Sequence, residues 1–259
     1  MMTQPAWTHA PGTQAGLSLI ELLIALALGL TLIMGLLQLF LASKQTYALQ
    51  QQVAMTQENA RFVIERLSTD VRQAGAYKCL DWQRLDSEQQ GLLPPALSQP
   101  VSVDNGVLRL VSALSRSDSR TDLPAWRYGA TWLLASDCQH RMRISDGPGL
   151  TLEAGEVLIP VRLVEYRLAE AGLQVRLHGR GRFDTLVEDV NGFELSFGLA
   201  PSPEQMQVAG DYQTTLTAQT LPRLRTVRLH LLFGSNGVDG ISRSFTQVVM
   251  LRNPQLREH

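Results

Sequence analysis

The sequence has no surplus of charge of either sign. Its 259 residues include 23 Lys and Arg and 24 Asp and Glu, so the formal net charge is only -1. Domains that bind nucleic acids usually carry a strongly basic surface, and this balance therefore argues against a nucleic-acid partner. A hydrophobic content of 44% with 18% charged residues is typical of a folded protein rather than a disordered one.

The sequence also lacks the motifs of common catalytic and cofactor sites. It contains no HExxH, no CxxC, no phosphate-binding loop and no internal repeat. We therefore expect no catalytic residues, no metal and no cofactor. Two weaker patterns leave alternatives open: His140 near Cys138 could belong to a metal or thiol site, and the oxygen-rich segment 234–240 could attract calcium, although such residues usually mark a turn. The five histidines are scattered along the chain: His9, His140, His178, His230 and His259.

Long apolar runs are absent with one exception, near the N-terminus. Residues 22–43 form an uncharged run between Glu21 and Lys44 that is dominated by Leu, Ile and Ala. As a helix this run would measure about 33 Å, which is enough to span a membrane once. A cleaved secretory signal has a shorter apolar core, of about 7 to 15 residues, and a cleavage site of small residues beyond it. A signal anchor without cleavage is the second alternative.

The residues before the apolar run distinguish these possibilities. Glu21 places a carboxylate at the edge of the run, where burial in lipid would cost on the order of 2.5 to 3.5 kcal/mol, and a bare anchor has no use for it. The preceding segment, residues 1–15, is hydrophilic and lacks Lys and Arg, and Gly16 follows it. Cleavage between Gly16 and Leu17 would leave a free amine on Leu17, four residues before the carboxylate.

The segment from Gly16 to Glu21 resembles the type III signal of type IV prepilins, which has a glycine before the cut and a glutamate as the fifth mature residue. The resemblance implies that a prepilin peptidase removes the leader, residues 1–16, and methylates the new amine of Leu17. It also implies that Glu21 pairs with the N-terminal amine of a neighbouring subunit. Two features depart from the pattern: prepilin leaders usually carry basic residues, and major pilins usually have Phe where Leu17 stands.

A helical pattern continues beyond the apolar run and ends near Gly75, a plausible C-cap. A helix from Leu17 to Ala74 would be about 87 Å long, far beyond the usual length in globular proteins. We therefore expect residues 17–43 to be the membrane or filament-core half and residues 44–75 to be an amphipathic half that packs on a globular body. The apolar residues of that second half recur at spacings of three, four and seven: Val53, Ala60, Val63, Leu67, Val71 and Ala74.

The body, residues 76–259, shows the period of two that is typical of strands. A run of strands after one helix predicts an α+β fold with a mostly antiparallel sheet. We expect segment 200–222 to be a surface loop and the arginines Arg223, Arg225 and Arg228 to face solvent on a strand rather than contact DNA. Strands are predicted at 101–103, 107–111, 131–135, 141–145, 157–168, 173–177, 193–197, 226–233 and 245–251, with turns at 104–106 and 170–172.

Three body segments, 60–75, 186–193 and 249–253, resemble PilW-type minor pilins of the type IV pilus. The resemblance implies a pilin-like fold and a non-enzymatic subunit that primes the pilus tip with other minor pilins and the assembly machinery. A tip adhesin is a candidate partner. The implied location is the inner membrane, with one span and a periplasmic body, and then the pilus tip. Two alternatives stay open: a J-type minor pseudopilin of type II secretion, which shares the segment 187–190 as a strand, and a signal-anchored periplasmic enzyme or binding protein.

Cysteine is scarce, since Cys79 and Cys138 are the only two. Both would lie in the oxidising periplasm, where a disulfide between them is expected. Closing a loop of about 60 residues would stabilise the fold by roughly 4 kcal/mol as an upper figure in the chain-entropy model, and would tie the end of the helix to the sheet. Two separate buried thiols are the alternative.

Overall fold

The computed structural model describes residues 16, 18–80, 85, 87–115, 123–234 and 242–252. Residues 1–15, the cleavage and methylation residue Leu17, and most of the 234–240 segment considered for calcium lie outside the described residues, as do His9 and His259. The chain divides into two compact units, Met1–Met55 and Thr56–His259.

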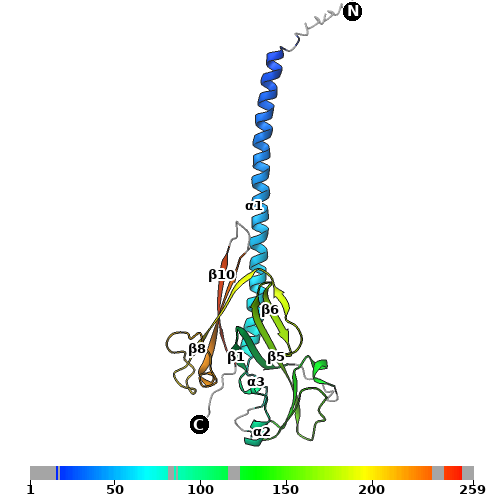
Figure 1. Cartoon of the computed structure of the whole chain (residues 1–259), viewed down its shortest axis with the longest axis vertical. Helices are drawn as coiled ribbons and strands as arrows, with labels where there is room; N and C mark the ends of the chain where they lie inside the picture. The colour runs from blue at the N-terminus through cyan, green and yellow to red at the C-terminus, as the bar shows by residue number, and fades with distance from the viewer. Residues whose placement is uncertain are drawn as a thin grey trace, which may run out of the picture. The chain divides into compact units, whose positions relative to one another are not determined.

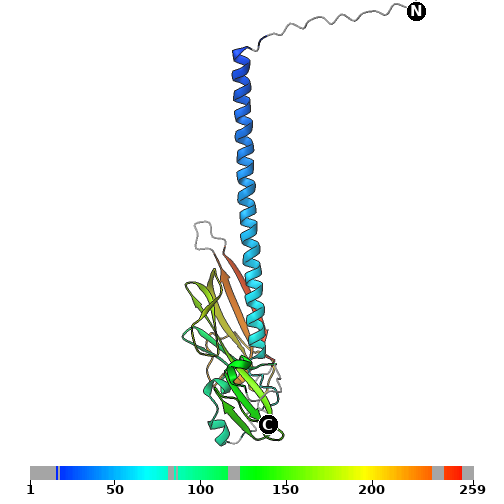
Figure 2. The same ribbon diagram turned by 90° about the vertical axis from the view of Figure 1, so that its right-hand side faces the viewer.

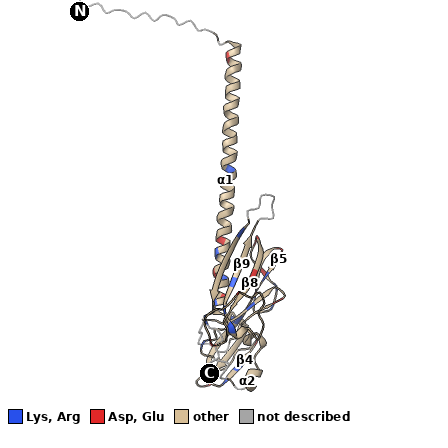
Figure 3. Ribbon diagram, turned by 90° about the vertical axis from the view of Figure 1, so that its left-hand side faces the viewer, with Lys and Arg blue, Asp and Glu red and all other residues tan. Residues whose placement is uncertain are grey.

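One helix, α1 (Leu19–Gln73), contributes to both units (Figure 1). The predicted ends, Leu17 and Ala74, agree with the observed ends within two residues. In the first unit, an 18-residue window of α1 is apolar and long enough to cross a membrane, and none of it is buried within the protein. Figure 3 shows a long stretch of this part of α1 without Lys, Arg, Asp or Glu. This confirms a long apolar N-terminal helix.

In the second unit, α1 buries one stripe of its surface. The helix ends at Gln73, and Gly75 adopts a left-handed conformation with a φ of 78°. The N–H of Gly75 donates to the carbonyl of Val111 at 2.9 Å, so the chain leaves the helix toward strand β2. The buried stripe follows the predicted spacing of three and four: Ala60, Val63, Leu67 and Val71.

The ten strands in the described part of the chain form two antiparallel sheets, which confirms the α+β class (Figures 1 and 2). The first sheet has the order β1-β2-β5-β3-β4, with β6 paired to β5 and β7 to β6, and the second has the order β10-β9-β8. The bounds are β1 (Val101–Asp104), β2 (Val107–Ala113), β3 (Trp132–Ser136), β4 (Met142–Ser145), β5 (Val157–Ala169), β6 (Gly172–Leu177), β7 (Asp184–Val187), β8 (Val190–Leu199), β9 (Leu224–Phe233) and β10 (Arg243–Met250).

Short helices fill the connections. They are α2 (Ser87–Gly91) and α3 (Pro95–Ser98) between α1 and β1, and the 3-10 helices η2 (Ala125–Tyr128) and η3 (Leu221–Arg223). The predicted hairpin turns are confirmed. Asn105 and Gly106 both have positive φ, as a two-residue turn between β1 and β2 requires, and Ala169 pairs with Gly172 across the turn between β5 and β6.

Each of the nine predicted strands has a counterpart, but β7 was not predicted and segment 187–190 was misread. That segment is not one strand, because β7 ends at Val187 in the first sheet and β8 begins at Val190 in the second. Asp189 has a φ of 60°, which breaks the extended conformation between the two sheets. The sequence pattern suggested that Val187 and Val190 lie in one strand, whereas the chain passes from the first sheet to the second between them.

The main core lies between the second part of α1 and both sheets. Leu67 of α1, Tyr166 of β5 and Leu229 of β9 are fully buried there. A second cluster contains Tyr77, Leu97 and Leu134, and the Tyr77 hydroxyl donates to the Leu97 carbonyl at 3.0 Å. The second cluster therefore ties the segment that follows α1 to the first sheet.

Candidate functional site

The start of α1 has a capping geometry that involves Glu21. A carboxylate oxygen of Glu21 accepts a hydrogen bond from the backbone N–H of Ser18 at 3.0 Å, and the Ser18 carbonyl accepts the N–H of Leu22 at 3.2 Å. This is the part of a capping box in which the third helical residue reaches back to the residue before the helix. The spacing Ser18-x-x-Glu21 is the sequence pattern of such a capping box, and this cap was not predicted. Glu21 therefore has a local role, while its predicted role between subunits stays a prediction.

The apolar part of α1 places its large side chains outward on every face. Leu36 is 65% exposed, and its Leu, Ile, Met and Phe neighbours between residues 19 and 41 are comparably exposed. The hydroxyl of Thr31 donates to the Leu28 carbonyl at 2.8 Å, so this polar group is satisfied within the helix. A helix that is apolar all round needs an apolar environment, and the described residues of this unit do not supply one.

The two cysteines form the predicted disulfide, with Cα atoms 5.3 Å apart. The loop between β3 and β4 is built around the Asp137 carboxylate, which accepts backbone N–H groups of Gln139, His140 and Arg141 at 3.0, 3.0 and 2.9 Å. Those hydrogen bonds, the one from Arg141 first, lower the pKa of Asp137 well below its usual range. Within the described residues, no group of three His, Cys, Asp or Glu side chains could hold a metal ion.

A buried carboxylate joins α1 to the first sheet. Asp70, which is 4% exposed, accepts hydrogen bonds from the Tyr166 hydroxyl at 2.5 Å, from Arg162 at 3.2 Å and from Arg66 at 3.2 Å. Burial raises the pKa of Tyr166, and the neighbouring Asp70 carboxylate raises it further, so the hydroxyl stays protonated and donates. The cluster is a polar clamp inside the main core.

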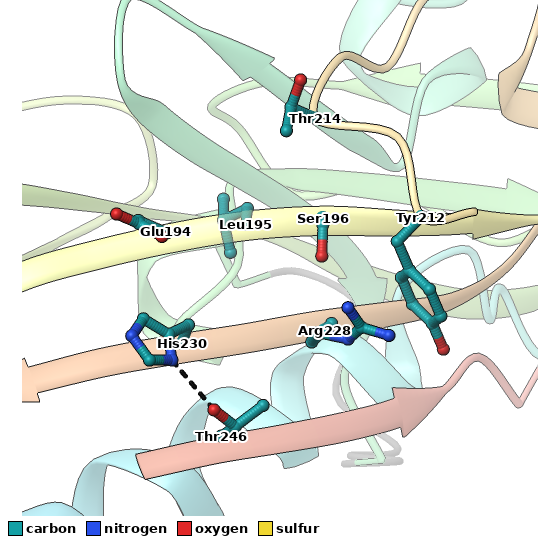
Figure 4. Close-up of a pocket in the computed structure, with 8 residues that line it drawn as sticks. All are labelled: Glu194, Leu195, Ser196, Tyr212, Thr214, Arg228, His230 and Thr246. Atoms are coloured by element: carbon teal, nitrogen blue, oxygen red, sulfur yellow. Dashed lines mark hydrogen bonds between the residues drawn. The ribbon is translucent and has the colours of Figure 1, made fainter. Parts of the chain in front are cut away.

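A groove of about 740 Å³ lies on the outward face of the second sheet. Side chains alternate along β9: Val227, Leu229 and Leu231 belong to the main core, whereas Arg228 and His230 point to the opposite face. The groove is lined by residues of β8, β9, β10 and the loop after β8, which are Glu194, Leu195, Ser196, Tyr212, Thr214, Arg228, His230 and Thr246 (Figure 4).

Segment 200–222 was predicted as a surface loop; the structure has a loop over 200–220, while Leu221 and Pro222 begin the 3-10 helix η3. The loop supplies one wall of the groove. Gln213 exchanges two backbone hydrogen bonds with Phe197 of β8, at 2.7 and 3.0 Å, and the Tyr212 hydroxyl lies 3.0 Å from the Thr226 hydroxyl. Gly198 leaves the room for this packing, because a Cβ there would lie 2.2 Å from the Thr226 hydroxyl oxygen and 3.1 Å from the Tyr212 ring. The position of Tyr212 over the sheet is therefore fixed by three contacts.

The prediction that the arginines of this strand face solvent is wrong for Arg225, which is buried. It is only 1% exposed, and burial lowers the pKa of its guanidinium. Arg225 and Arg228 are three residues apart in β9, so they point to opposite faces, and this parity was the signal that the sequence reasoning missed. Arg225 holds the loop before β9 by donating to the carbonyls of Pro203, Gln205, Pro222 and Leu224.

The comparisons with known proteins add no assignment. The chain has no match among models of protein families, among curated protein sequences or among solved structures.

Proposed function

We propose that this chain is a minor pilin of the type IV pilus, a structural subunit without catalysis of its own that takes part in priming the pilus tip. The observation that carries the proposal is the segment from Gly16 to Glu21, directly followed by an apolar stretch of α1 that is not buried within the chain. The α+β body and its disulfide are consistent with an exported domain.

The physical role of Glu21 follows from its position at the edge of the apolar run. In the proposal, cleavage after Gly16 creates an amine on Leu17, and the peptidase methylates it. The Glu21 carboxylate of one subunit then pairs with that amine on its neighbour, which offsets the cost of a charge in an apolar surrounding. Before assembly, the hydrogen bond from the Ser18 N–H holds the Glu21 side chain against the first turn of α1.

The apolar stretch has two successive environments in this proposal. Before assembly it spans the inner membrane, and in the filament it packs against the helices of other subunits, so its exposed leucines are covered in both states. The proposed partners are prepilin peptidase, membrane lipid, other minor pilins, the assembly machinery and a tip adhesin.

Cleavage is tested with Gly16→Ala, and Gly29→Ala in the same helix is the matched control, because a Cβ at Gly29 meets open space. Intact-mass measurement of the membrane-extracted protein should show the wild type and Gly29→Ala without residues 1–16 and with one added methyl group. Gly16→Ala should keep the leader and fail to enter pili. A wild-type protein that retains residues 1–16 would contradict the proposal and favour the signal-anchored alternative.

The phenotype of a gene deletion distinguishes the proposed pilin from a pseudopilin of type II secretion. Deletion of the gene should reduce the number of surface pili and leave secretion of folded periplasmic enzymes unchanged. The reverse result would assign the chain to type II secretion while leaving the cleavage intact.

A further inference from the structure

The groove on the second sheet carries one charge of each sign, at opposite ends. Figure 4 shows Arg228 turned toward Tyr212 at one end, and Glu194 beside His230 at the other. Neither Glu194 nor Arg228 makes an ion pair with any residue in the described part of the chain, although Arg228 stacks on the Tyr212 ring and His230 shares a hydrogen bond with Thr246. Two uncompensated charges of opposite sign form a complementary site for a ligand that also carries both.

The side chain of Arg228 is held in one orientation by its contact with Tyr212. Its guanidinium lies 3.7 Å from the centroid of the Tyr212 ring, and that ring is itself fixed by Thr226 and by the backbone bridge of Gln213. A guanidinium that stacks on an aromatic ring keeps its N–H groups at the edge available for a carboxylate. The Arg228 side chain is therefore already ordered in the free protein, and binding a ligand costs little further side-chain entropy there.

The spacing of the two charges matches an extended peptide. Glu194 of β8 is the cross-strand partner of His230, and Arg228 lies two residues before His230 in β9. The two charged residues are therefore diagonal neighbours, about 7 Å apart. In an extended peptide, alternate side chains on one side are also about 7 Å apart.

The remaining lining suits a peptide backbone. Ser196, Thr214 and Thr246 contribute hydroxyl groups to the lining, with Ser196 opposite Arg228 and Thr246 opposite His230 in the sheet register. A volume of about 740 Å³ lies within the range of sites that hold a small ligand or a short segment. The groove lies on a sheet face and not inside the core, so a segment of a larger protein can reach it.

We propose that this groove binds an extended peptide segment of a partner protein in which an acidic and a basic side chain are two residues apart, the acid on Arg228 and the base on Glu194. The inference goes beyond the proposed function and does not rest on it, because it uses no residue of α1 or of the leader. It names a docking site for a second protein on the outward face of the body.

The test uses the full chain in detergent and an array of ten-residue peptides with a Ser and Gly background. Each peptide carries one Asp and one Lys, in either order, separated by one to four positions. Binding should be strongest at a separation of two, and replacing either charged residue of the peptide by Gln should weaken binding about tenfold. Equal binding of the peptides at all four separations would overturn the proposal. It would also be overturned if free zwitterionic amino acids displaced the bound peptide as effectively as an unlabelled copy of that peptide does.

Variants assign the charges. Arg228→Gln should remove the preference for Asp, and Glu194→Gln should remove the preference for Lys. Arg127→Gln is the matched control, because Arg127 also stacks on an aromatic ring, Trp126 at 4.8 Å, but does not line the groove. Unchanged unfolding midpoints must accompany the losses. If Arg228→Gln retains the Asp preference, or if the two variants instead abolish self-association of the chain, a partner peptide is not the occupant.

Discussion

The two parts of α1 have the same secondary structure and opposite surroundings. In the first unit, the large aliphatic side chains are exposed, and no residue of the membrane-length window is buried. In the second unit, Val63 and Leu67 are fully buried, and a carboxylate, Asp70, is buried with them. The first part thus depends on surroundings outside the chain, whereas the second part finds its apolar and polar partners within the body. The difference predicts that stability of the body is insensitive to changes in the first part.

The largest effect is expected for Asp70→Ala. The change leaves the buried Tyr166 hydroxyl and the partly buried Arg162 guanidinium without their shared acceptor, and it should lower the free energy of unfolding by about 4 kcal/mol. Urea unfolding of the full chain in detergent, followed by tryptophan fluorescence, measures the loss. Glu65→Ala on the exposed side of the same helix should change it by less than about 0.5 kcal/mol, and equal losses would show that the polar clamp does not stabilise the body.

A matched pair of leucine truncations tests the comparison directly. Leu67→Ala removes a fully buried side chain and should cost about 3 kcal/mol. Leu36→Ala removes a side chain that is 65% exposed, and it should leave the unfolding midpoint of the body unchanged. The same urea experiment applies to both. A substantial loss for Leu36→Ala would mean that the first part of α1 contributes to folding of the body.

The smallest expected effect concerns Asp137 and is a dependence on pH. Because hydrogen bonds lower the pKa of Asp137 in the folded protein, its stabilising contribution is fully present above the unfolded value of about 4 and is lost as the pH falls toward the folded value. The wild type should therefore be more stable than Asp137→Asn at neutral pH, and the difference should narrow below about pH 4. Unfolding midpoints in urea at a series of pH values measure this, with Glu88→Gln on exposed α2 as the control. A difference that is constant with pH would contradict it.

Much of the fold could be predicted because its signals are local in the sequence. The apolar run 22–43, the stripe at Ala60, Val63 and Leu67 and the turn at Asn105 and Gly106 each depend on neighbouring residues, and all of them are confirmed. Strand β7 was missed because its sequence, Asp-Thr-Leu-Val, does not alternate polar and apolar residues. Its approach needs Gly172, where any Cβ would collide with the backbone of Val187.

The candidate sites divide in the same way. The roles of Gly16 and Glu21 were predicted from their spacing in the chain and stay predictions. The disulfide between Cys79 and Cys138 was predicted because the sequence offers one pairing only, and it is confirmed. The groove was not found, because Glu194, Tyr212 and Arg228 come from three segments whose register is decided by sheet pairing. The burial of Arg225 was missed although the parity of β9 contained the signal.

By itself, the sequence determined the chain's long apolar helix, its change from helix to strands and its pair of cysteines, since these depend on composition and on periods of 3.6 and two. Only the tertiary structure decided that Asp70 meets Tyr166, 96 positions away, and that Arg228 and Glu194 make no ion pair among the described residues. The physical reason is that contacts between distant segments follow from how sheets pair and pack, and no local pattern records that choice.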